Sequence, residues 1–593
     1  MVADCHPPHA AGQARGAARD RGGLAVHCGF LALIAVLAEF NRFWAFRVPL
    51  LVLLLSIPGV ILLRALRIPG RTVACFPVLI PCASIVVSLG SGLVMDLAGP
   101  AIGVSAPLRT LPLLVCLTAT CLVLLALSVN VTPDIKVPWR SISRPGRLAW
   151  PFILPLTAAA GAVSVNSGHG DELAEAALLL CVAALLVSMV LAARIEEPLL
   201  AVALYSIGLA IMWSYSLRGN LAAGSDIATE YQTLHQTIVS GIWHVAHPGD
   251  AYGGMLSVTV LPAELSFLSG LPGLLVLKAV FPLIGALFPL EIFGLARRIL
   301  SPRWAFAAAA FTIAEVSFGG GLPAHAREEI ALVFFAALVT VMLASRLARS
   351  SQAALVALLG LAMVVSHYPT TYIAIALIGL ALLLQRLMSR FAGVARASAP
   401  MVVAFAVALA GALAWYALLT GSASGLSARA HSAAGPGPVA CQELLTLLGA
   451  LGALIMVARR KVSAVTRHIG LLGMAAVVFL AAVRLSGTAA VFSPYRQAEA
   501  FVQPAVILVV AFCWVMQGIG GVRKGRQAGA LLLSTAFLAA SVVRTSGLPG
   551  GIVDGMRAAH ARGGADYAGF LIAAGEPAAA GPRPALPRRE GRP

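Results

Sequence analysis

The sequence is dominated by long apolar runs that recur from residue 26 to residue 543. The runs are roughly 17 to 25 residues long and end at Arg, Gly, Pro or Asn, and this is the length that an α-helix needs to cross the hydrocarbon core of a bilayer. Segments of strand length in which polar and apolar residues alternate are absent, which excludes a transmembrane β-barrel. The sequence therefore predicts an all-α fold, a polytopic transmembrane helical bundle, because helices then remain as the way to satisfy backbone groups in lipid.

Composition supports this fold and excludes several classes of protein. Of the 593 residues, 59% are hydrophobic and 11% are charged, too few polar residues to cover a water-soluble protein of this size. The net charge of +18 does not indicate a nucleic-acid partner, because the basic residues lie in pairs and triplets between the apolar runs. The nine cysteines lie mostly inside predicted spans without CxxC spacing, so neither a disulfide framework nor a zinc site is predicted.

We expect about 17 membrane spans, one for each apolar run of sufficient length. Their predicted ranges are 26–41, 46–64, 73–94, 109–129, 149–166, 173–192, 198–216, 273–296, 304–322, 328–345, 352–367, 369–388, 399–419, 441–458, 468–484, 499–519 and 527–543. Residues 254–271 contain Pro262 and Glu264, which interrupt the apolar run. We therefore expect a partial or re-entrant element there, lining the loop that precedes it.

The predicted spans also suggest how the chain is divided. We expect a polar cytoplasmic N-terminus at 1–23, an N-terminal transmembrane extension of about six spans at 24–197, a transmembrane module at 198–545, and a largely disordered extracytoplasmic tail at 546–593. The module contains a long loop at 217–253, after the seventh predicted span, in which we expect a helix.

Lysine and arginine residues alternate between the predicted loops and so predict an orientation. They gather in alternate loops, for example 64–71, 136–147, 297–303, 386–396, 459–467 and 523–526. The positive-inside rule places these loops in the cytoplasm. The sequence therefore predicts a multi-pass protein of the plasma membrane with a cytoplasmic N-terminus and with the loop at 217–253 on the extracytoplasmic face.

The segment from Gly224 to Gly253 is the longest polar interruption between two strongly apolar regions. It opens with Asp226 and Glu230, which lie four residues apart and share one face of a predicted helix, and it continues past Trp243. A carboxylate in this position is suited to act as a general base. The alternative is that Ser225 or Asp226 merely caps a helix over 227–241, which is a common use of these residue types and does not exclude reactivity.

Two further polar groups fall on the same predicted face. Arg327, followed by Glu328 and Glu329, begins a span, and its planar guanidinium is suited to bind phosphate. The alternative is an interfacial arginine paired with its neighbours. His367 and Tyr368 lie at the tip of a predicted helical hairpin, where they could contact a phosphate or a sugar hydroxyl, or simply face the lipid headgroups.

Two further basic residues could either contact a substrate or simply face the membrane interface. Arg496 opens the predicted span at 499 from the outer side and is a further candidate for phosphate contact. Lys278 shares a predicted span with Glu291, and charges inside a membrane are functional candidates, although near the end of a span they can snorkel or pair. The sequence has no Walker loop, no GxGxxG motif after a strand and no metal-spaced His or Cys cluster, so ATP-driven transport lacks support.

Several segments together resemble a family of large archaeal and bacterial multi-pass membrane proteins whose members look like GT-C glycosyltransferases. The resemblance covers Trp213 to Tyr372, in the runs GSDIATEYQ, GIW, YGGMLSVTVLP, LKAVFPLIGALFPLEIF, REEIALVFF and VVSHYPTTY, and more weakly SPYRQAEAFVQP. It implies a GT-C-like module, a polyprenyl-phosphate sugar donor, and an acid of the first long outer loop that acts as base or metal ligand. Asp226 matches that acid, with Glu230 as its partner, and Arg327, His367 and Arg496 are then candidates for phosphate contact.

These observations lead to a functional hypothesis and two alternatives. We expect a membrane glycosyltransferase that moves a sugar from a polyprenyl-phosphate donor to a glycan, lipid or protein acceptor at the extracytoplasmic face. A divalent cation, Mg²⁺ or Mn²⁺, is the cofactor to consider, with Asp226 as its candidate ligand. The alternatives are a transporter or flippase of a lipid-linked or anionic substrate, and a non-catalytic scaffold for envelope assembly.

Overall fold

The computed structural model describes residues 16–129, 149–222, 226–245, 249–344, 347–392, 398–421, 440–459, 461–486 and 502–520. Within these ranges the protein is helical and contains no strand, which confirms the predicted all-α class. Arg496, the predicted span at 527–543 and the predicted tail at 546–593 lie outside the described residues.

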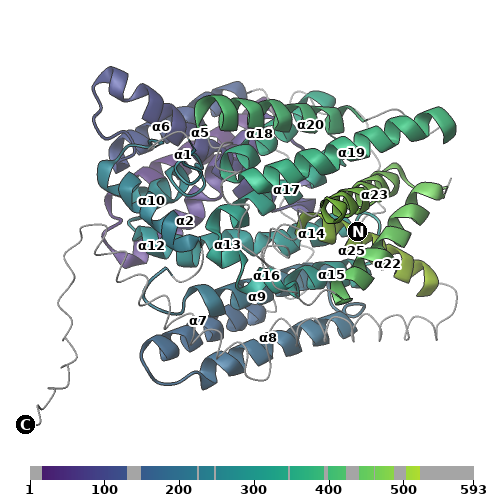
Figure 1. The fold of residues 1–593 in the computed structure, drawn as a ribbon. Coiled ribbons are helices and arrows are strands. Elements are labelled where there is room, and N and C mark those ends of the chain that lie inside the picture. Colours follow the sequence, from purple (N-terminus) through teal and green to yellow (C-terminus); the bar gives the residue numbers. More distant parts are fainter. Residues whose placement is uncertain are drawn as a thin grey trace, which may run out of the picture.

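The helices of the first part of the chain precede the long polar loop. They are α1 (Gly16–Glu39), α2 (Trp44–Leu54), α3 (Ile57–Ala65), α4 (Gly70–Cys75), α5 (Leu79–Ala98), α6 (Thr110–Leu127), α7 (Ile153–Asn166), α8 (Glu172–Leu191) and α9 (Glu197–Ser216). Figure 1 shows α7, α8 and α9 next to one another along one edge of the molecule.

The remaining helices include the loop helix and the centre of the bundle. They are α10 (Ile227–Ser240), α11 (Val260–Ser269), α12 (Gly273–Leu275), α13 (Phe281–Gly285), α14 (Leu287–Ala296), α15 (Pro302–Ile313), α16 (Val316–Gly319), α17 (Ala326–Met342), α18 (Arg349–Ser366), α19 (Tyr368–Ala392), α20 (Ala399–Ala412), α22 (Ala440–Ala458), α23 (Ala464–Leu485) and α25 (Val502–Gly520). The predicted loop helix is α10, and α11 is the short element predicted within 254–271.

Ten helices of the described residues are long and apolar enough to cross a membrane, and five shorter apolar helices accompany them. This is fewer than the about 17 spans expected from apolar length alone. The continuous span predicted at 304–322 is wrong, because α15 ends at Ile313 and is followed by α16 and a short turn. The break between α15 and α16 falls at Ala314 and Glu315, and the glycines Gly319 to Gly321 and Pro323 then end α16.

The segment Gly273–Ala296 has the length of a span but not a continuous α-helical ladder. Its first turn, α12, leads into a π-helical turn at Val276–Val280, and Pro282 then stands in the first turn of α13. Proline has no N–H to donate to the preceding turn, and π-helical turns occur mostly as local insertions in α-helices. The break therefore lies beside Lys278, inside the bundle.

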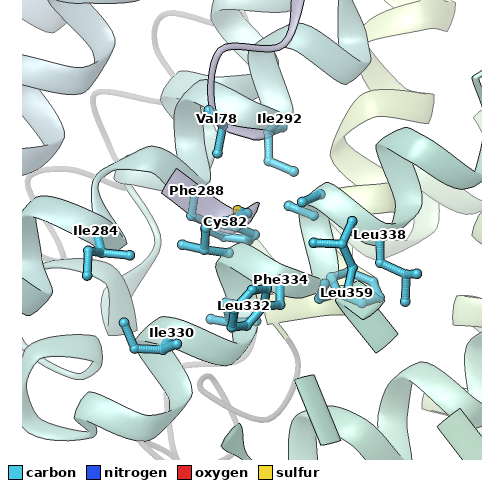
Figure 2. Packing of buried hydrophobic residues seen from close by; sticks show 14 of the residues in the cluster. Val78, Cys82, Ile284, Phe288, Ile292, Ile330, Leu332, Phe334, Leu338 and Leu359 are labelled. Carbon is cyan, nitrogen blue, oxygen red and sulfur yellow. The ribbon is translucent and has the colours of Figure 1, made fainter. Parts of the chain in front are cut away.

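The core of the bundle surrounds α17, of which every residue from Ala326 to Met342 is buried. This helix packs against α18, α13, α14, α19 and α5. Figure 2 shows Phe334 and Leu338 of α17 in an apolar cluster with Phe288 of α14, Cys82 of α5 and Leu359 of α18. Because α5 belongs to the predicted N-terminal extension, helices of the extension contribute directly to the core of the module.

Apolar side chains also remain exposed on the outer helices. Leu111 and Val115 of α6, Val163 of α7, and Leu180 and Val187 of α8 are each more than half exposed. A water-soluble protein rarely exposes apolar surface of this extent, whereas a membrane protein turns it toward lipid. Together with the ten long apolar helices, this surface defines a multi-pass helical membrane protein.

Candidate functional site

Helix α10 positions the first two candidate residues at the edge of the bundle. Its buried side chains, Ile227, Glu230, Leu234 and Thr237, recur at three- and four-residue intervals and so form one face. The helix ends at Gly241, whose φ of 71° is in the left-handed region that favours glycine. The Gly241 carbonyl accepts a hydrogen bond of 2.9 Å from the backbone N–H of Leu108, which fixes this end of α10 to the chain before α6.

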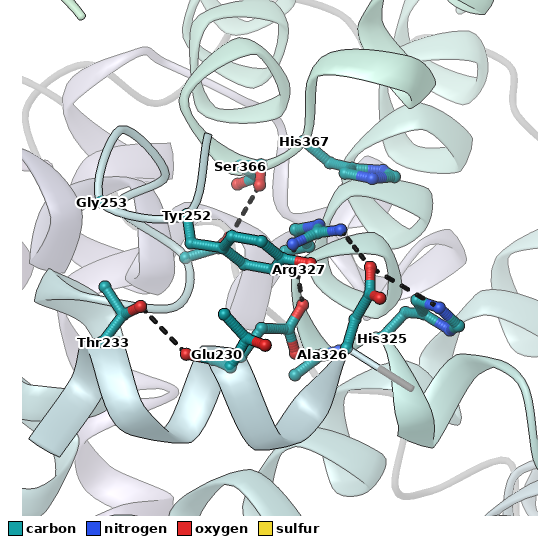
Figure 3. Close-up of polar contacts among 12 residues, drawn as sticks. Glu230, Thr233, Tyr252, Gly253, His325, Ala326, Arg327, Ser366 and His367 are labelled. Atoms are coloured by element: carbon teal, nitrogen blue, oxygen red, sulfur yellow. Dashed lines mark hydrogen bonds and ion pairs between the residues drawn. The ribbon is translucent and has the colours of Figure 1, made fainter. Parts of the chain in front are cut away.

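Asp226 lies at the N-cap position of α10, yet its carboxylate makes no capping hydrogen bond. Its Oδ2 atom instead accepts a hydrogen bond of 2.5 Å from Nη2 of Arg327, and Nε2 of His325 lies 3.8 Å from the same oxygen. The capping interpretation therefore does not account for this side chain. Figure 3 labels the two partners of this carboxylate, Arg327 and His325, at the start of α17.

Glu230, one turn further along α10, is fully buried and is held by the N-terminus of α17. Its Oε2 accepts a hydrogen bond of 2.9 Å from the backbone N–H of Ala326, and its Oε1 lies 3.6 Å from Nη1 of Arg327. A carboxylate at a helix N-terminus is stabilised by the free N–H groups and the helix dipole. Burial nevertheless raises the pKa of Glu230 to about 7, against the opposing effect of Arg327 and with a smaller contribution from Asp226.

Asp226, Glu230 and Arg327, with His325 beside Asp226, form an ionic cluster. Arg327 lies at the centre of this ionic cluster and is itself buried. Besides the two carboxylates, its guanidinium carbon lies 4.2 Å from the centre of the Tyr252 ring, in a cation–π arrangement. Tyr252 is in turn positioned by Asp250, whose Oδ1 accepts hydrogen bonds from the backbone N–H groups of Tyr252 and Gly253 at 3.1 and 2.9 Å. Figure 3 shows the guanidinium of Arg327 beside the ring of Tyr252.

His367 lies between α18 and α19 and is directed to the same region. It is buried, and its Nδ1 lies 2.8 Å from the hydroxyl of Thr370. Burial lowers the pKa of His367 well below its ordinary value, and the nearby Arg327 and His325 lower it further. The imidazole is therefore neutral at pH 7 and can exchange a hydrogen bond with a substrate without adding charge.

Tyr368 begins α19 and is part of an aromatic group. Its ring centre lies 5.7 Å from that of His367, 6.3 Å from that of Tyr372 and 6.4 Å from that of Tyr416. Tyr416 is fixed by hydrogen bonds from its hydroxyl to the Val364 carbonyl and the Thr371 hydroxyl. The half-buried rings of Tyr368 and Tyr372 on α19 therefore lie next to His367, on one side of the ionic cluster.

Trp243 holds the loop beyond α10 in place rather than joining the ionic cluster. Its backbone N–H donates to Oδ1 of Asp96 at 2.8 Å, and its indole N–H donates to the Gly253 carbonyl at 2.8 Å. Its ring stacks on that of Trp415, with the ring centres 5.8 Å apart and the planes 10° from parallel. These contacts connect α5, the loop and the segment after α20.

The other secondary candidates have different environments. Glu328 is buried in the first turn of α17. Glu329 is directed at α13, where the position that a Cβ of Gly285 would occupy lies 2.3 Å from its Oε1. Lys278 donates three hydrogen bonds, to the carbonyls of Arg218, Gly219 and Leu221 at 3.1, 2.5 and 3.0 Å. Lys278 therefore does not contact the ionic cluster. It binds backbone carbonyls of the segment that follows α9.

The residues of the cluster do not suit a divalent cation. Among the described residues no group of three or more His, Cys, Asp or Glu side chains is arranged to hold a metal ion. Oδ2 of Asp226, the candidate ligand, already accepts a hydrogen bond from the cationic Arg327. A second positive charge at this oxygen would be repelled by Arg327, so we derive no reaction step through a metal.

Two residues of this region were not among the sequence candidates. Tyr252 follows the turn at Asp250, and Asp96 interrupts an apolar run in α5. The lone acid in an apolar run was a signal that could have identified Asp96. Tyr252 carries no such signal, because its role depends on a guanidinium 75 positions further along the chain.

The arrangement has the parts that acid–base chemistry on an anionic substrate requires. Asp226 offers a carboxylate, Arg327 a positive charge, and His367 a neutral hydrogen-bonding ring, all from separate helices. A buried cluster with more carboxylates than cations can accept a proton, and its guanidinium can accept an anion. A scan against models of protein families and a search of curated proteins each found no match.

Proposed function

We propose that the protein is a membrane glycosyltransferase that moves a sugar from a polyprenyl-phosphate donor to an acceptor hydroxyl at the extracytoplasmic face. The observation that supports this most is the Asp226–Arg327 pair, which joins a candidate base to a candidate phosphate ligand at one point. Ten long apolar helices supply the membrane setting that a lipid-linked donor needs.

In this proposal the donor phosphate competes with Asp226 for Arg327. A guanidinium binds a phosphate through two parallel hydrogen bonds, which fits the two terminal nitrogens that now contact Asp226 and Glu230. His367 adds a neutral hydrogen bond. Once Arg327 turns to the phosphate, the Asp226 carboxylate loses its cation and becomes a stronger base.

The reaction then follows as a single displacement. Asp226 takes the proton of the acceptor hydroxyl, the acceptor oxygen forms a bond to the anomeric carbon, and the bond from that carbon to the phosphate oxygen breaks. The polyprenyl phosphate leaves with the electron pair, and the configuration of the sugar is inverted. Arg327 stabilises the charge that develops on the phosphate in a buried, low-dielectric site.

The first test is transfer of a radiolabelled sugar from polyprenyl phosphate by the purified protein. We expect Asp226→Asn to slow transfer by roughly 10²–10⁴-fold, the typical contribution of a general base. The matched control is Glu172→Gln, which makes the same carboxylate-to-amide change at an exposed position of α8. An Asp226→Asn protein that transfers sugar at the wild-type rate would overturn the proposal.

One observation favours a transporter as the second candidate. The segment Gly273–Ala296 is a discontinuous helix with a π-helical turn, and discontinuous helices commonly line the substrate sites of transporters. Glu291, within this segment, is buried and its Oε1 has no hydrogen-bond partner among the described residues. The same assay separates the two candidates, because a transporter leaves the sugar–phosphate bond of the donor intact.

A further inference from the structure

A second acidic group lies away from the ionic cluster, on the short helix α11. Glu264 is fully buried, and within the described part of the chain neither of its carboxyl oxygens has a hydrogen-bond partner. Helix α11 packs against α5, α6 and α10. The reaction proposed above makes no use of this residue.

The carboxyl group of Glu264 occupies space that α5 leaves open. The position that a Cβ of Gly92 would take lies 3.4 Å from Oε2 of Glu264 and 2.6 Å from Cγ1 of Val260. A side chain at position 92 would therefore force the Val260 side chain of α11 to move. Gly92 is six residues from the end of α5 at Ala98, which places this point roughly 9 Å inside that end of the helix.

The surroundings of Glu264 determine its protonation state. The titratable groups that face it are the thiols of Cys116 and Cys121 on α6, and neither supplies a positive charge. On α5 the nearest acid is Asp96, one turn beyond Gly92, which accepts a hydrogen bond from the Trp243 N–H. An ionised carboxylate without a partner is very costly in such a site, so the neutral acid is the stable form.

A row of polar positions on α5 passes beside this acid. Ser84, Ser88, Gly92 and Asp96 follow one another at four-residue intervals and therefore lie along one side of the helix. All but the glycine carry buried polar side chains, and the hydroxyl of the adjacent Ser91 is buried with no partner among the described residues. Ser84 and Ser88 lie on one side of Gly92, and Asp96 lies one turn beyond Gly92 on the other side, toward the end of α5, so Asp96 is the next polar side chain of the row in that direction.

We propose that Glu264 is a proton-binding site inside the bundle, which holds a proton at rest and exchanges it along the Asp96 side of α5. Packing alone gives no reason for an acid here, because an apolar side chain of similar volume would leave no unpartnered polar atoms. The inference is independent of the proposed glycosyl transfer, since it concerns other helices and a different ligand.

The proton can be detected with a hydrophobic carbodiimide, N,N′-dicyclohexylcarbodiimide, applied to the wild-type protein in lipid bilayers. A protonated carboxyl adds across one C=N bond of this reagent, with its proton passing to nitrogen, and the adduct is mapped by mass spectrometry of peptides. We expect the adduct at Glu264 to be at least about tenfold more abundant than at Glu172, which is exposed to water and does not offer the apolar surroundings that this reagent enters. A water-soluble carbodiimide with a glycine ester should show the reverse preference.

Two results would overturn the proposal. The first is the absence of an adduct at Glu264 in the folded wild-type protein. The second is protection of Glu264 by sodium chloride but not by potassium chloride at the same pH, which would assign the site to a sodium ion. Because the adduct is mapped in the wild-type protein, neither result depends on whether a variant folds.

Exchange of the proton is tested by infrared spectroscopy in D₂O. The carbonyl stretch of a protonated carboxylic acid should be present in the wild-type protein, should be lost in Glu264→Gln, and should shift as deuterium replaces the proton. A band that is lost in the variant but never shifts in the folded wild-type protein would show a permanently sealed acid and would contradict exchange.

Discussion

The sequence allowed two interpretations of Asp226, a helix cap or a functional carboxylate, and the structure is inconsistent with the cap. Asp226 lies where a helix cap is expected, but its carboxylate contacts Arg327 and His325 instead of the free N–H groups of α10. Arg327 is buried and forms its ion pair with this carboxylate. The cost of leaving a buried guanidinium unpaired exceeds the benefit of a cap, which explains the choice.

Glu230 predicts a pH dependence of stability. Its pKa is about 7 in the folded protein, mainly because of burial, and lies near the ordinary value for glutamate when the chain is unfolded. The folded state therefore binds this proton more tightly, so the stabilisation is present below the unfolded pKa and is lost as pH rises through about 7. We expect the unfolding temperature of the wild-type protein in detergent, relative to that of Glu230→Gln, to fall between pH 5 and pH 8.

The control for this measurement is Glu172→Gln, whose unfolding temperature should follow that of the wild-type protein at every pH because Glu172 is exposed. Parallel curves for the wild-type protein and Glu230→Gln across this pH range would contradict the assigned shift in pKa.

At the residue level the sequence was informative where polar residues interrupt apolar runs. Asp226 and Glu230 could be selected because they open the longest polar segment, and Arg327 and His367 because they lie at the ends of apolar runs; the structure brings all four into one region. Tyr252 could not be selected, because an aromatic ring in a loop has no unusual cost that would draw attention to it. Its contact with Arg327 follows from tertiary packing alone.

At the level of elements, the helices with uniform apolar runs were predicted closely. The ranges 109–129, 173–192 and 198–216 correspond to α6, α8 and α9 within two residues at each end. The range 46–64 corresponds to the candidate span Trp44–Ala65, which contains a short turn between Leu54 and Ile57, whereas the range 304–322 was predicted as a single span and the chain breaks after Ile313. Mean hydropathy does not register these breaks, because they depend on where Pro and Gly interrupt the backbone hydrogen bonds.

Lys278 illustrates how a charge inside a span can serve the fold. Its three hydrogen bonds satisfy carbonyls of residues 218–221, which follow the end of α9 and have no intrahelical donors. We expect Lys278→Met to lower the free energy of unfolding by about 1–3 kcal/mol, the typical cost of leaving buried polar groups unpaired. The measurement is chemical unfolding in detergent micelles.

The comparison variant is Lys461→Met, because Lys461 is exposed. We expect it to leave stability unchanged, and we expect sugar transfer by Lys278→Met to remain near the wild-type rate at a temperature where the variant is folded. Loss of transfer with unchanged stability would instead place Lys278 on the path of a substrate.

At the level of the whole molecule, the candidate site forms at one end of the most buried helix. Every residue of α17 is buried, and its N-terminus meets α10 from a loop about a hundred positions earlier in the chain. The alternation of Lys and Arg among the loops predicts that this end faces outward. The pattern of charges along the sequence can predict on which side of the membrane residues lie, but it contains no information on distances. The contact between Asp226 and Arg327 could therefore be found only in the structure.

The central claim is that Asp226 and Arg327 act as one pair, and a double-mutant cycle tests it most directly. Asp226→Asn and Arg327→Gln should each lower the free energy of unfolding in detergent, because each removes one partner of a buried ion pair. The double variant should be more stable than the sum of the single effects predicts, with a coupling of at least about 1.5 kcal/mol. Strictly additive effects would show that the two side chains do not interact and would contradict the site described here.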